Sequence, residues 1–292
     1  MIYLQSFSML TREDEEVFFN KRSNVKAYRT CYTTKYPFHV FRYRELPVFT
    51  FGDITILYGG NGSGKSTILN VIAEKLQLRR GAFYNRSDFF EDYVGLCRYR
   101  KAWGKSIPPE SRIITSDDVF DYLLDIRCIN EGVDTERAAL FDKYVSDRYE
   151  PYQLKSLDDY EEFRRRLDAK TKSESEFVKE RLMRNVQERS NGESALLYFT
   201  DSIKEDALYL LDEPENSLSA SLQLELRKYI EVSARNFRCQ FIISTHSPFL
   251  LSMDQAVIYD LDVTPPCQRP WTELENVRIY HDFFRQHAAE FE

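Results

Sequence analysis

The chain has 292 residues and a formal net charge of −7, with 42% hydrophobic and 30% charged residues. This balance is typical of a water-soluble globular protein of one large domain or two ordinary ones, and it excludes disordered and collagen-like chains. A chain with a net negative charge cannot be a wholly basic protein that coats nucleic acid. A local basic groove that binds nucleic acid is still compatible with this composition.

The N-terminal part of the chain predicts β-strands, because apolar and β-branched residues gather there. Strands are expected over residues 2–10, 38–51 and 54–58. A polar, acidic turn over residues 11–16 is expected to separate the first two. Pro47 interrupts the second segment, which places it near a sheet edge.

A glycine-rich loop follows the run 54–58. Residues 59–66 read Gly-Gly-Asn-Gly-Ser-Gly-Lys-Ser and fit GxxxxGK[ST]. Helical spacing of apolar residues from Ile68 to Leu76 follows, so the loop joins a strand to a helix. Glycines let the backbone fold round an anion with its N–H groups inward. Lys65 can then reach the β- and γ-phosphates, and Ser66 can offer a hydroxyl to Mg²⁺.

The residues expected to bind the nucleotide at this loop form one continuous segment. They are Gly59, Gly60, Asn61, Gly62, Ser63, Gly64, Lys65, Ser66 and Thr67. A glycine-rich turn that merely opens a helix is the alternative interpretation.

Residues 79–189 differ from the rest, because charged residues dominate and apolar strand-like runs are scarce. Amphipathic helices are expected over residues 117–126 and 160–186. The run Arg164–Arg166 on the second helix is expected to face water. The pattern predicts a helical subdomain inserted into an α/β core.

The core is expected to resume after the insert. Strands are predicted at 207–211, 241–243 and 257–259. A helix over 219–234 follows the first of them, and this alternation favours a parallel sheet covered on both faces. The proline-rich segment 264–270 predicts a loop, and residues 273–291 predict a final helix against the core.

These elements suggest four parts of the chain. Residues 1–78 supply the N-terminal strands and the glycine loop, and residues 79–189 form the insert. Residues 190–263 complete the core, and residues 264–292 form the C-terminal loop and helix.

Reactive side chains follow two of the predicted core strands. Asp212 ends the first, where a second magnesium ligand beside Ser66 is needed. Glu213 comes next and can orient and deprotonate an attacking water. His246 follows another strand, where a neutral imidazole can contact the γ-phosphate and the water. We predict Ser66 and Asp212 as metal ligands and Glu213 and His246 as catalytic residues, although acidic strand ends and single histidines are also common for structural reasons.

Together these residues resemble the ATP-binding cassette (ABC) ATPase family. Gly59–Ser66 resembles its Walker A motif, Leu208–Glu213 its Walker B motif, and His246 its switch histidine. Ser190-Asn191-Gly192-Glu193 is similar to its signature sequence, although such a turn also suits a helix cap. The resemblance implies that Ser190, Gly192 and Glu193 contact nucleotide. It also implies an α/β fold: a P-loop NTPase core with N-terminal antiparallel β-strands and the inserted helical subdomain.

The details resemble soluble members of the family, namely SMC-like repair proteins and small standalone bacterial ATPases. Asp-Glu-Pro-Glu-Asn from Asp212, Ser-Thr-His-Ser-Pro around His246, and the aromatic residues from Tyr280 to Phe291 are similar to theirs. They differ from most transporter cassettes.

Two family features have no clear match in this sequence. No glutamine occurs between residues 77 and 153, where the magnesium-sensing glutamine is expected, and Asp117 or Asp118 is a candidate substitute. The adenine-stacking aromatic is also unassigned, with Tyr36 and Phe38 as candidates.

The resemblance implies a head-to-tail homodimer that ATP closes, with the nucleotide between Walker A of one subunit and the signature of the other. Loss of the γ-phosphate would then loosen the dimer. We expect a soluble ATPase switch that uses ATP and Mg²⁺ and acts on an unidentified protein partner or on nucleic acid; a role in bacterial defence rests on analogy alone.

Other functions remain open at this point. A transporter cassette, an SMC-like DNA machine, a P-loop kinase or GTPase, and a non-hydrolysing nucleotide-binding scaffold are the alternatives. The charged helices are too short for SMC-like heptad arms.

The cysteines and the hydropathy of the chain bear on its cellular location. The five cysteines form no CxxC pair, so neither a zinc ribbon nor a disulfide framework is expected. The N-terminus lacks a secretory pattern, and no apolar run approaches the roughly 20 residues that span a bilayer. We expect a cytoplasmic protein without membrane insertion.

Overall fold

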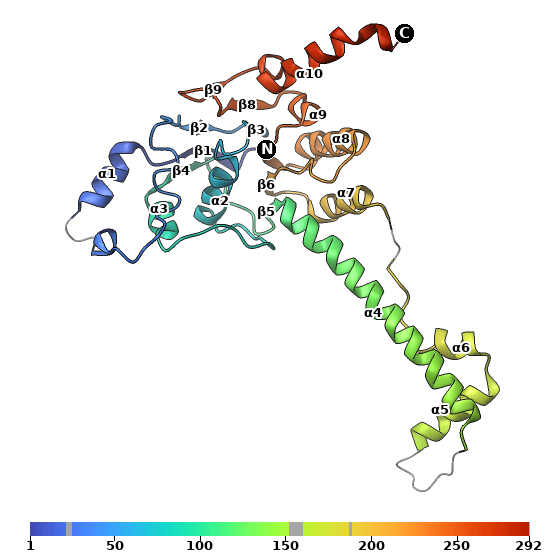
Figure 1. Ribbon diagram of the computed structural model, residues 1–292. Coiled ribbons are helices and arrows are strands. Elements are labelled where there is room, and N and C mark those ends of the chain that lie inside the picture. Colours follow the sequence, from blue (N-terminus) through green and yellow to red (C-terminus); the bar gives the residue numbers. More distant parts are fainter. Residues whose placement is uncertain (22–24, 152–159, 187–188, 292) are drawn as a thin grey trace. The chain divides into compact units, whose positions relative to one another are not determined.

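The computed structural model describes residues 1–21, 25–151, 160–186 and 189–291 (Figure 1). Two compact units are distinguished. The first combines Met1–Phe120 with Ser190–Glu292, and the second is Asp121–Arg189. The second unit begins later than the predicted insert, because residues 79–120 supply strands to both sheets of the first unit.

A six-stranded sheet forms the centre of the first unit, in the order β5-β6-β7-β3-β8-β9. Its strands are β3 (Ile54–Tyr58), β5 (Arg112–Thr115), β6 (Leu208–Asp212), β7 (Gln240–Ser244), β8 (Val257–Asp260) and β9 (Cys267–Gln268). All pairs are parallel except β8 with β9. Every residue of β3 and β7 is buried, as the continuous apolar runs predict. The short strand β9 lies inside the predicted loop 264–270, so that prediction is wrong at two residues.

A second, antiparallel sheet in the order β2-β1-β4 belongs to the same unit (Figure 1). Its strands are β1 (Leu4–Ser8), β2 (Phe49–Thr50) and β4 (Arg98–Lys101). Little of the predicted strand region 38–51 is a strand, because only its last residues pair with β1.

Seven α-helices of the first unit accompany the two sheets in the described residues, apart from the start of α4. They are α1 (Arg12–Asn20), α2 (Lys65–Lys75), α3 (Phe90–Leu96), α7 (Asn191–Ser202), α8 (Ala220–Asn236), α9 (Pro248–Leu251) and α10 (Glu275–Gln286). The predicted turn over 11–16 is wrong, because Thr11 and Asp14 form a capping box that starts α1. Short 3₁₀ helices, η1 (Val25–Tyr28), η3 (Trp271–Glu273) and η4 (Ala288–Glu290), complete the described segments.

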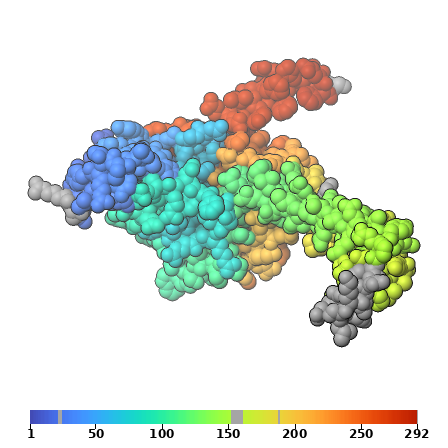
Figure 2. Space-filling view, turned by 60° about the horizontal axis from the view of Figure 1, so that its bottom comes forward, coloured from blue at the N-terminus to red at the C-terminus, as the bar shows by residue number. Residues whose placement is uncertain are grey.

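The final helix is present, but it packs differently from the prediction. Within α10 only Val277 is buried, and Leu274 at its N-cap is fully buried. Ile279, Tyr280, Phe283 and Phe284 are exposed, on the C-terminal segment that is red in Figure 2. The helix therefore contacts the rest of the unit mainly through its first turn.

The second unit consists of helices. The 34-residue α4 (Ser116–Tyr149) begins in the first unit, and α5 (Tyr160–Thr171) and α6 (Glu174–Lys179) follow. The predicted helix 160–186 is interrupted, because Ser173 caps α6. The arginine run does not simply face water: Arg165 and Arg166 both pair with the carboxylate of Asp147, which is 2% exposed. Among the described residues, no helix combines the length and apolarity that crossing a bilayer requires.

Candidate nucleotide-binding site

The loop Gly59–Ser66, called the P-loop below, connects β3 to α2 at the carboxyl end of the central strand. Its backbone is left-handed at Gly62, with φ of 79°, and at Gly64, with φ of 97°. A Cβ on Gly64 would lie 2.4 Å from Cε1 of Phe41, so a side chain there would collide with the buried ring. The backbone at Gly64 therefore requires glycine. Because Gly64 is the N-cap of α2, the N-terminus of this helix faces the loop.

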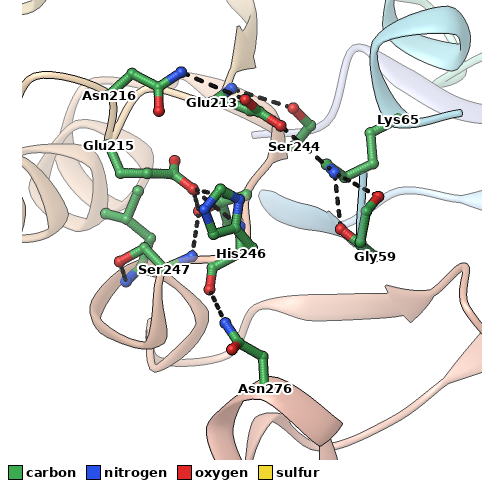
Figure 3. A network of polar contacts seen from close by, with 12 residues as sticks. Gly59, Lys65, Glu213, Glu215, Asn216, Ser244, His246, Ser247 and Asn276 are labelled. Carbon is green, nitrogen blue, oxygen red and sulfur yellow. Dashed lines mark hydrogen bonds and ion pairs between the residues drawn. The ribbon is translucent and has the colours of Figure 1, made fainter. Parts of the chain in front are cut away.

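Lys65 is folded into the P-loop (Figure 3). Its side chain is 4% exposed, and its Nζ donates to the carbonyl oxygens of Gly59 at 2.7 Å and Gly60 at 3.2 Å. The same nitrogen lies 3.5 Å from Oε1 of Glu213. The structure thus brings the predicted phosphate-binding lysine and the predicted base together, although 148 positions separate them in sequence.

Asp212 ends β6 beside the start of α2. Its Oδ1 accepts a hydrogen bond from the Ser66 hydroxyl at 3.1 Å and another from the Ser244 hydroxyl at the end of β7. Burial raises the pKa of Asp212, and the bonds from both hydroxyls oppose that shift only in part. A cation placed here would relieve the cost of burying the carboxylate.

The fit of Ser66 and Asp212 to magnesium can be judged from their chemistry. Both supply the oxygen ligands that Mg²⁺ prefers, and they already lie within hydrogen-bond distance. In the described part of the chain, no three His, Cys, Asp or Glu side chains converge to form a metal cage. Mg²⁺ is usually held by one or two protein ligands together with substrate phosphates and water, and Ser66 and Asp212 are two such ligands.

Glu213 occupies a strained position directly after β6. Its φ is 49°, a left-handed conformation that is uncommon for a residue with a side chain and that clusters at functional sites. Its main-chain N–H donates to the carbonyl of Ser244 at 3.0 Å, and its Oε2 accepts from Asn216 at 3.4 Å. These contacts fix its Oε1 beside Lys65.

His246 follows β7 and is held by its main chain (Figure 3). Its N–H donates to Oε1 of Glu215 at 2.9 Å, and its carbonyl accepts from Asn276 at 2.8 Å. The imidazole is 46% exposed, with Nδ1 3.5 Å from the same Glu215 oxygen. The backbone is therefore fixed while the ring remains accessible.

Two residues that sequence reasoning missed brace the P-loop. Arg44 donates to the carbonyl of Ser63 at 2.6 Å and to that of Leu261 at 3.2 Å. Asp262 accepts from the N–H of Gly60 through both carboxylate oxygens, at 2.8 and 3.0 Å. Neither belongs to a motif, and Asp262 lies 202 positions from its partner, so no local signal could have identified it.

The segment Ser190–Glu193, called the signature segment below, starts α7. Ser190 is the N-cap: its hydroxyl accepts from the Glu193 N–H, and the Glu193 carboxylate accepts from the Ser190 N–H at 3.0 Å. A Cβ on Gly192 would lie 2.7 Å from Cδ1 of Leu222 and 3.1 Å from the carbonyl of Ser217. Within the single chain Ser190 therefore caps α7, and a side chain at position 192 would press on Leu222 and on the backbone of Ser217.

Of the four candidates for the unmatched family features, Asp117 is exposed, and the other three make contacts of their own. Oδ1 of Asp118 accepts from the N–H of Ala82 and Oδ2 from that of Thr115, both at 2.7 Å, so this buried carboxylate is a structural tie. Phe38 is 3% exposed inside an aromatic cluster and offers no free face. Tyr36 donates its hydroxyl to Oγ1 of Thr67 at 3.1 Å, and it thereby connects its loop to the start of α2.

The parallel sheet, the P-loop between β3 and α2, the acidic end of β6 and the histidine after β7 define an ABC-class P-loop ATPase. The chain belongs to the family described as "AAA domain, putative AbiEii toxin, Type IV TA system", which matches residues 101–252, just over half of its length.

One relative and two solved structures show the similarity at low sequence identity. The chain is 24% identical over 217 residues to a protein of Mycoplasma genitalium named "Putative ABC transporter ATP-binding protein", covering 71% of this chain and 58% of the relative. It thus spans less than two thirds of that protein. The similar solved structures include an Smc head domain of Pyrococcus furiosus bound to the C-terminal domain of ScpA. It is 15% identical to this chain, the match covers 81% of this chain and 94% of that one, and the TM-score is 0.40. A dimeric ATP-binding cassette bound to ADP and Pi shows 12% identity, coverage of 78% and 90%, and a TM-score of 0.36.

Proposed function

We propose that this protein hydrolyses ATP at a composite site between two head-to-tail subunits and so acts as an ATP-driven switch. The observation that carries the proposal is the convergence of Lys65, Glu213, Asp212 and Ser66 at the carboxyl ends of β3 and β6. Phosphate-binding, basic and metal-binding groups meet where open α/β sheets bind their ligands.

Within one subunit, the P-loop N–H groups and Lys65 would bind the β- and γ-phosphates. Ser66 and Asp212 would hold Mg²⁺, which neutralises phosphate charge when bound. Glu213 is the general base in this proposal, because its carboxylate is fixed beside Lys65 and only partly exposed. The exposed imidazole of His246 is available to the γ-phosphate side of the site.

The partner subunit would supply the signature segment. Ser190 caps the N-terminus of a 12-residue helix, where main-chain N–H groups and the helix dipole favour an anion. Tyr43 is 76% exposed beside the loop-bracing Arg44, and it is our candidate for stacking on adenine in place of Tyr36 or Phe38.

The switch would act on a protein partner or on nucleic acid in the cytoplasm. A transporter subunit and an SMC-like DNA-processing ATPase use the same fold, and the name of the Mycoplasma relative is compatible with the first. A defence role is an extension by analogy with standalone ATPases.

The test compares Glu213→Gln with the wild type and with Glu225→Gln, a control that removes an exposed carboxylate on α8. We expect Glu213→Gln to bind MgATP and to turn over about 10²–10⁴-fold more slowly, the usual worth of a positioned base. Light scattering should show it accumulating as an ATP-bound dimer, while the control behaves like the wild type. Near-normal turnover would reassign the base, with His246 examined first.

A further inference from the structure

Strand β4 and the turn after it form an exposed basic and aromatic segment, called the basic edge below. Residues 98–105 read Arg-Tyr-Arg-Lys-Ala-Trp-Gly-Lys, with four cations and no carboxylate, in a chain whose net charge is −7. All four residues of β4 are exposed, and the strand lies at the edge of its sheet. In the part of the chain that the structure describes, one side of β4 is therefore open to a ligand.

The pairing of β4 with β1 arranges the side chains of the basic edge. Arg98 and Arg100 lie opposite the half-exposed Ser8 and Ser6, whereas Tyr99 lies opposite the buried Phe7. Side chains alternate between the two faces of a sheet, so both guanidinium groups belong to the face away from the core. Their Cα atoms follow each other at about 6.7 Å along the strand.

Trp103 lies in the turn that ends the basic edge. The N–H of Lys105 donates to the carbonyl of Ala102 at 3.0 Å, and Gly104 has a φ of 70°, which suits the third position of a type II turn. Trp103 occupies the second position and is 99% exposed. The whole face of its indole ring is thus available to a ligand.

The three cations of β4 carry no counter-charge from the described residues. Their side chains form neither an ion pair nor a hydrogen bond there, and Asp14 acts on Arg98 only from beyond ion-pair distance. Lys105 differs, because Glu110 and Asp206 line the same surface pocket. The positive potential of the basic edge therefore comes mainly from β4 itself.

We propose that the basic edge binds single-stranded nucleic acid, with phosphates at Arg98, Arg100 and Lys101 and a base stacked on Trp103. Guanidinium groups bind phosphate oxygens in pairs, which suits a phosphodiester backbone that runs along the strand. Stacking on an exposed ring needs an unpaired base, so a single strand fits better than a duplex. Tyr99, which is 39% exposed, offers a second ring among the cations.

Other occupants use only part of this surface. Cations alone are common on edge strands, where they prevent pairing with other strands, but this role does not require an exposed indole. A second copy of the chain would bring its own basic edge, and like charges repel. An acidic peptide matches the charge and leaves the ring of Trp103 without a planar group to stack on. Nucleic acid engages both the cations and the ring.

Binding at the basic edge does not depend on ATP hydrolysis. The inference that the bound strand is what the ATP-driven switch acts on does rest on the proposed function. Binding and hydrolysis are therefore measured separately, the first on the nucleotide-free protein.

The first test measures stacking. A fluorescein-labelled oligothymidylate of about 20 nucleotides, longer than the site of a typical single-strand-binding module, is titrated with protein, and its anisotropy is followed. Trp103→Ala should weaken binding about tenfold or more, the usual loss for one stacked base. Trp103→Phe keeps a ring and should retain most of the affinity. Neither change threatens the fold, because the side chain is fully exposed.

The second test measures the phosphate contacts through salt. The slope of log affinity against log salt concentration is about −0.7 for each phosphate contact of a single strand, so three contacts predict a slope of about −2. Arg98→Gln combined with Arg100→Gln should reduce the slope to about −0.7. The matched control combines Lys228→Gln with Arg235→Gln, which removes the same charge from exposed positions on α8 and should keep the wild-type slope.

Several outcomes would overturn the proposal. They are failure of both oligothymidylate and oligouridylate to bind, an affinity unchanged by Trp103→Ala, a salt slope unchanged by the double arginine variant, and equally tight binding of a duplex of the same length. Polyglutamate that competes as well as oligothymidylate would show that only charge is recognised. Phosphatidylserine vesicles that bind through Trp103 while neither oligonucleotide binds would assign the surface to a membrane.

Two further results are separate from these. A preference for oligouridylate or for oligothymidylate assigns RNA or DNA as the ligand, and either supports the proposal. Absent ATP hydrolysis by the wild type, with or without oligonucleotide, refutes the proposed function, whereas the anisotropy titrations still decide whether the basic edge binds nucleic acid.

Discussion

Lys65 is hydrogen-bonded to its own loop, and these bonds determine part of what its removal should do. Lys65→Ala eliminates the ammonium that would meet the phosphates, so we expect ATP affinity to fall about 10²-fold or more. The carbonyls of Gly59 and Gly60 also lose their donor. The free energy of unfolding should therefore fall by about 1 kcal/mol. Calorimetric titration with ATP and urea denaturation measure the two effects.

A matched control for this lysine lies on the same helix. Lys75 also donates to a main-chain carbonyl, that of Gly95 at 2.9 Å, but it is far along α2 from the P-loop. Lys75→Ala should leave ATP affinity unchanged. If Lys65→Ala binds ATP as tightly as this control does, the assignment of the P-loop is wrong.

Asp212 should give the protein a distinctive pH dependence. Burial raises the pKa of Asp212, so the folded state binds its proton more tightly than the unfolded state does. Stability from this group is complete below the unfolded pKa of about 4 and is lost as the pH rises through the folded value. Asp212→Asn should therefore melt at a higher temperature than the wild type at pH 7.5 without Mg²⁺ or nucleotide, and the difference should shrink toward pH 4. Thermal unfolding across that range measures it.

Asp206 provides a control, because its pKa shifts in the opposite direction to that of Asp212. Hydrogen bonding from Arg238 lowers the pKa of Asp206, so its charge favours the folded state above the ordinary carboxyl pKa. Asp206→Asn should melt slightly lower than the wild type at pH 7.5, with the difference fading as the pH falls. An Asp212→Asn curve that runs parallel to the wild type at every pH would mean that burial does not penalise this carboxylate.

At the scale of elements, the first turn of α7 combines a structural task with a proposed functional one. A Cβ added at Gly192 would press on Ser217 and Leu222, so a bulky substitution there would disturb the monomer as well as any dimer. Ser190→Asp separates the tasks, since aspartate caps a helix as well as serine does but repels phosphate. In this variant the new carboxylate faces that of Glu193, which now accepts from the Ser190 hydroxyl at 2.8 Å, so we expect a modestly lower melting temperature. ATP binding should be retained, and ATP-dependent dimerisation and hydrolysis should be lost. Light scattering and phosphate release measure these properties.

The matched control is Ser173→Asp at the N-cap of α6, because Ser173 and Glu176 form the same capping box as Ser190 and Glu193. Because Ser173 lies in the second unit, outside the signature segment, this variant should lose a similar amount of stability but still dimerise with ATP. Normal hydrolysis by Ser190→Asp would reduce the signature segment to an ordinary helix cap.

Some of the strands could be predicted from the sequence and others could not. Strands β3, β6, β7 and β8 were predictable because they are buried on both faces and read as unbroken apolar runs. Strand β4 was not, since all four of its residues are exposed and only backbone pairing with β1 defines it.

The residues of the candidate site also divide into those that the sequence predicts and those that it does not. The P-loop and the acidic strand end are local motifs, so the sequence identifies them directly. The contacts of Arg44, Asp262 and Glu215 depend on chain segments that only the fold brings together. The side-chain cap at Thr11 was readable, yet the acidic residues after it favoured a turn over the helix α1 that forms.

For the whole molecule, the proposed head-to-tail arrangement predicts complementation between two inactive variants. In a heterodimer of Lys65→Ala with Ser190→Asp, one composite site carries both lesions and the other carries neither. Equal mixing with random pairing should restore about a quarter of the wild-type ATPase rate, because half of the dimers then hold one intact site of two. Phosphate release from the mixture and from each variant alone measures this. A mixture that forms heterodimers but stays inactive would contradict sites that fire independently.

The carbonyls that hold Lys65 would turn the proposed capture of nucleotide into a partial exchange of acceptors. The ammonium has three N–H donors, and two of them are committed to Gly59 and Gly60. A phosphate oxygen would therefore take the third donor or displace a carbonyl, and the net affinity would be the difference between the bonds gained and the bonds lost. As the phosphates left, the lysine would return to the carbonyls, so its charge would not have to be rehydrated in full. The loop would thus act as its own surrogate ligand and lower the cost of product departure.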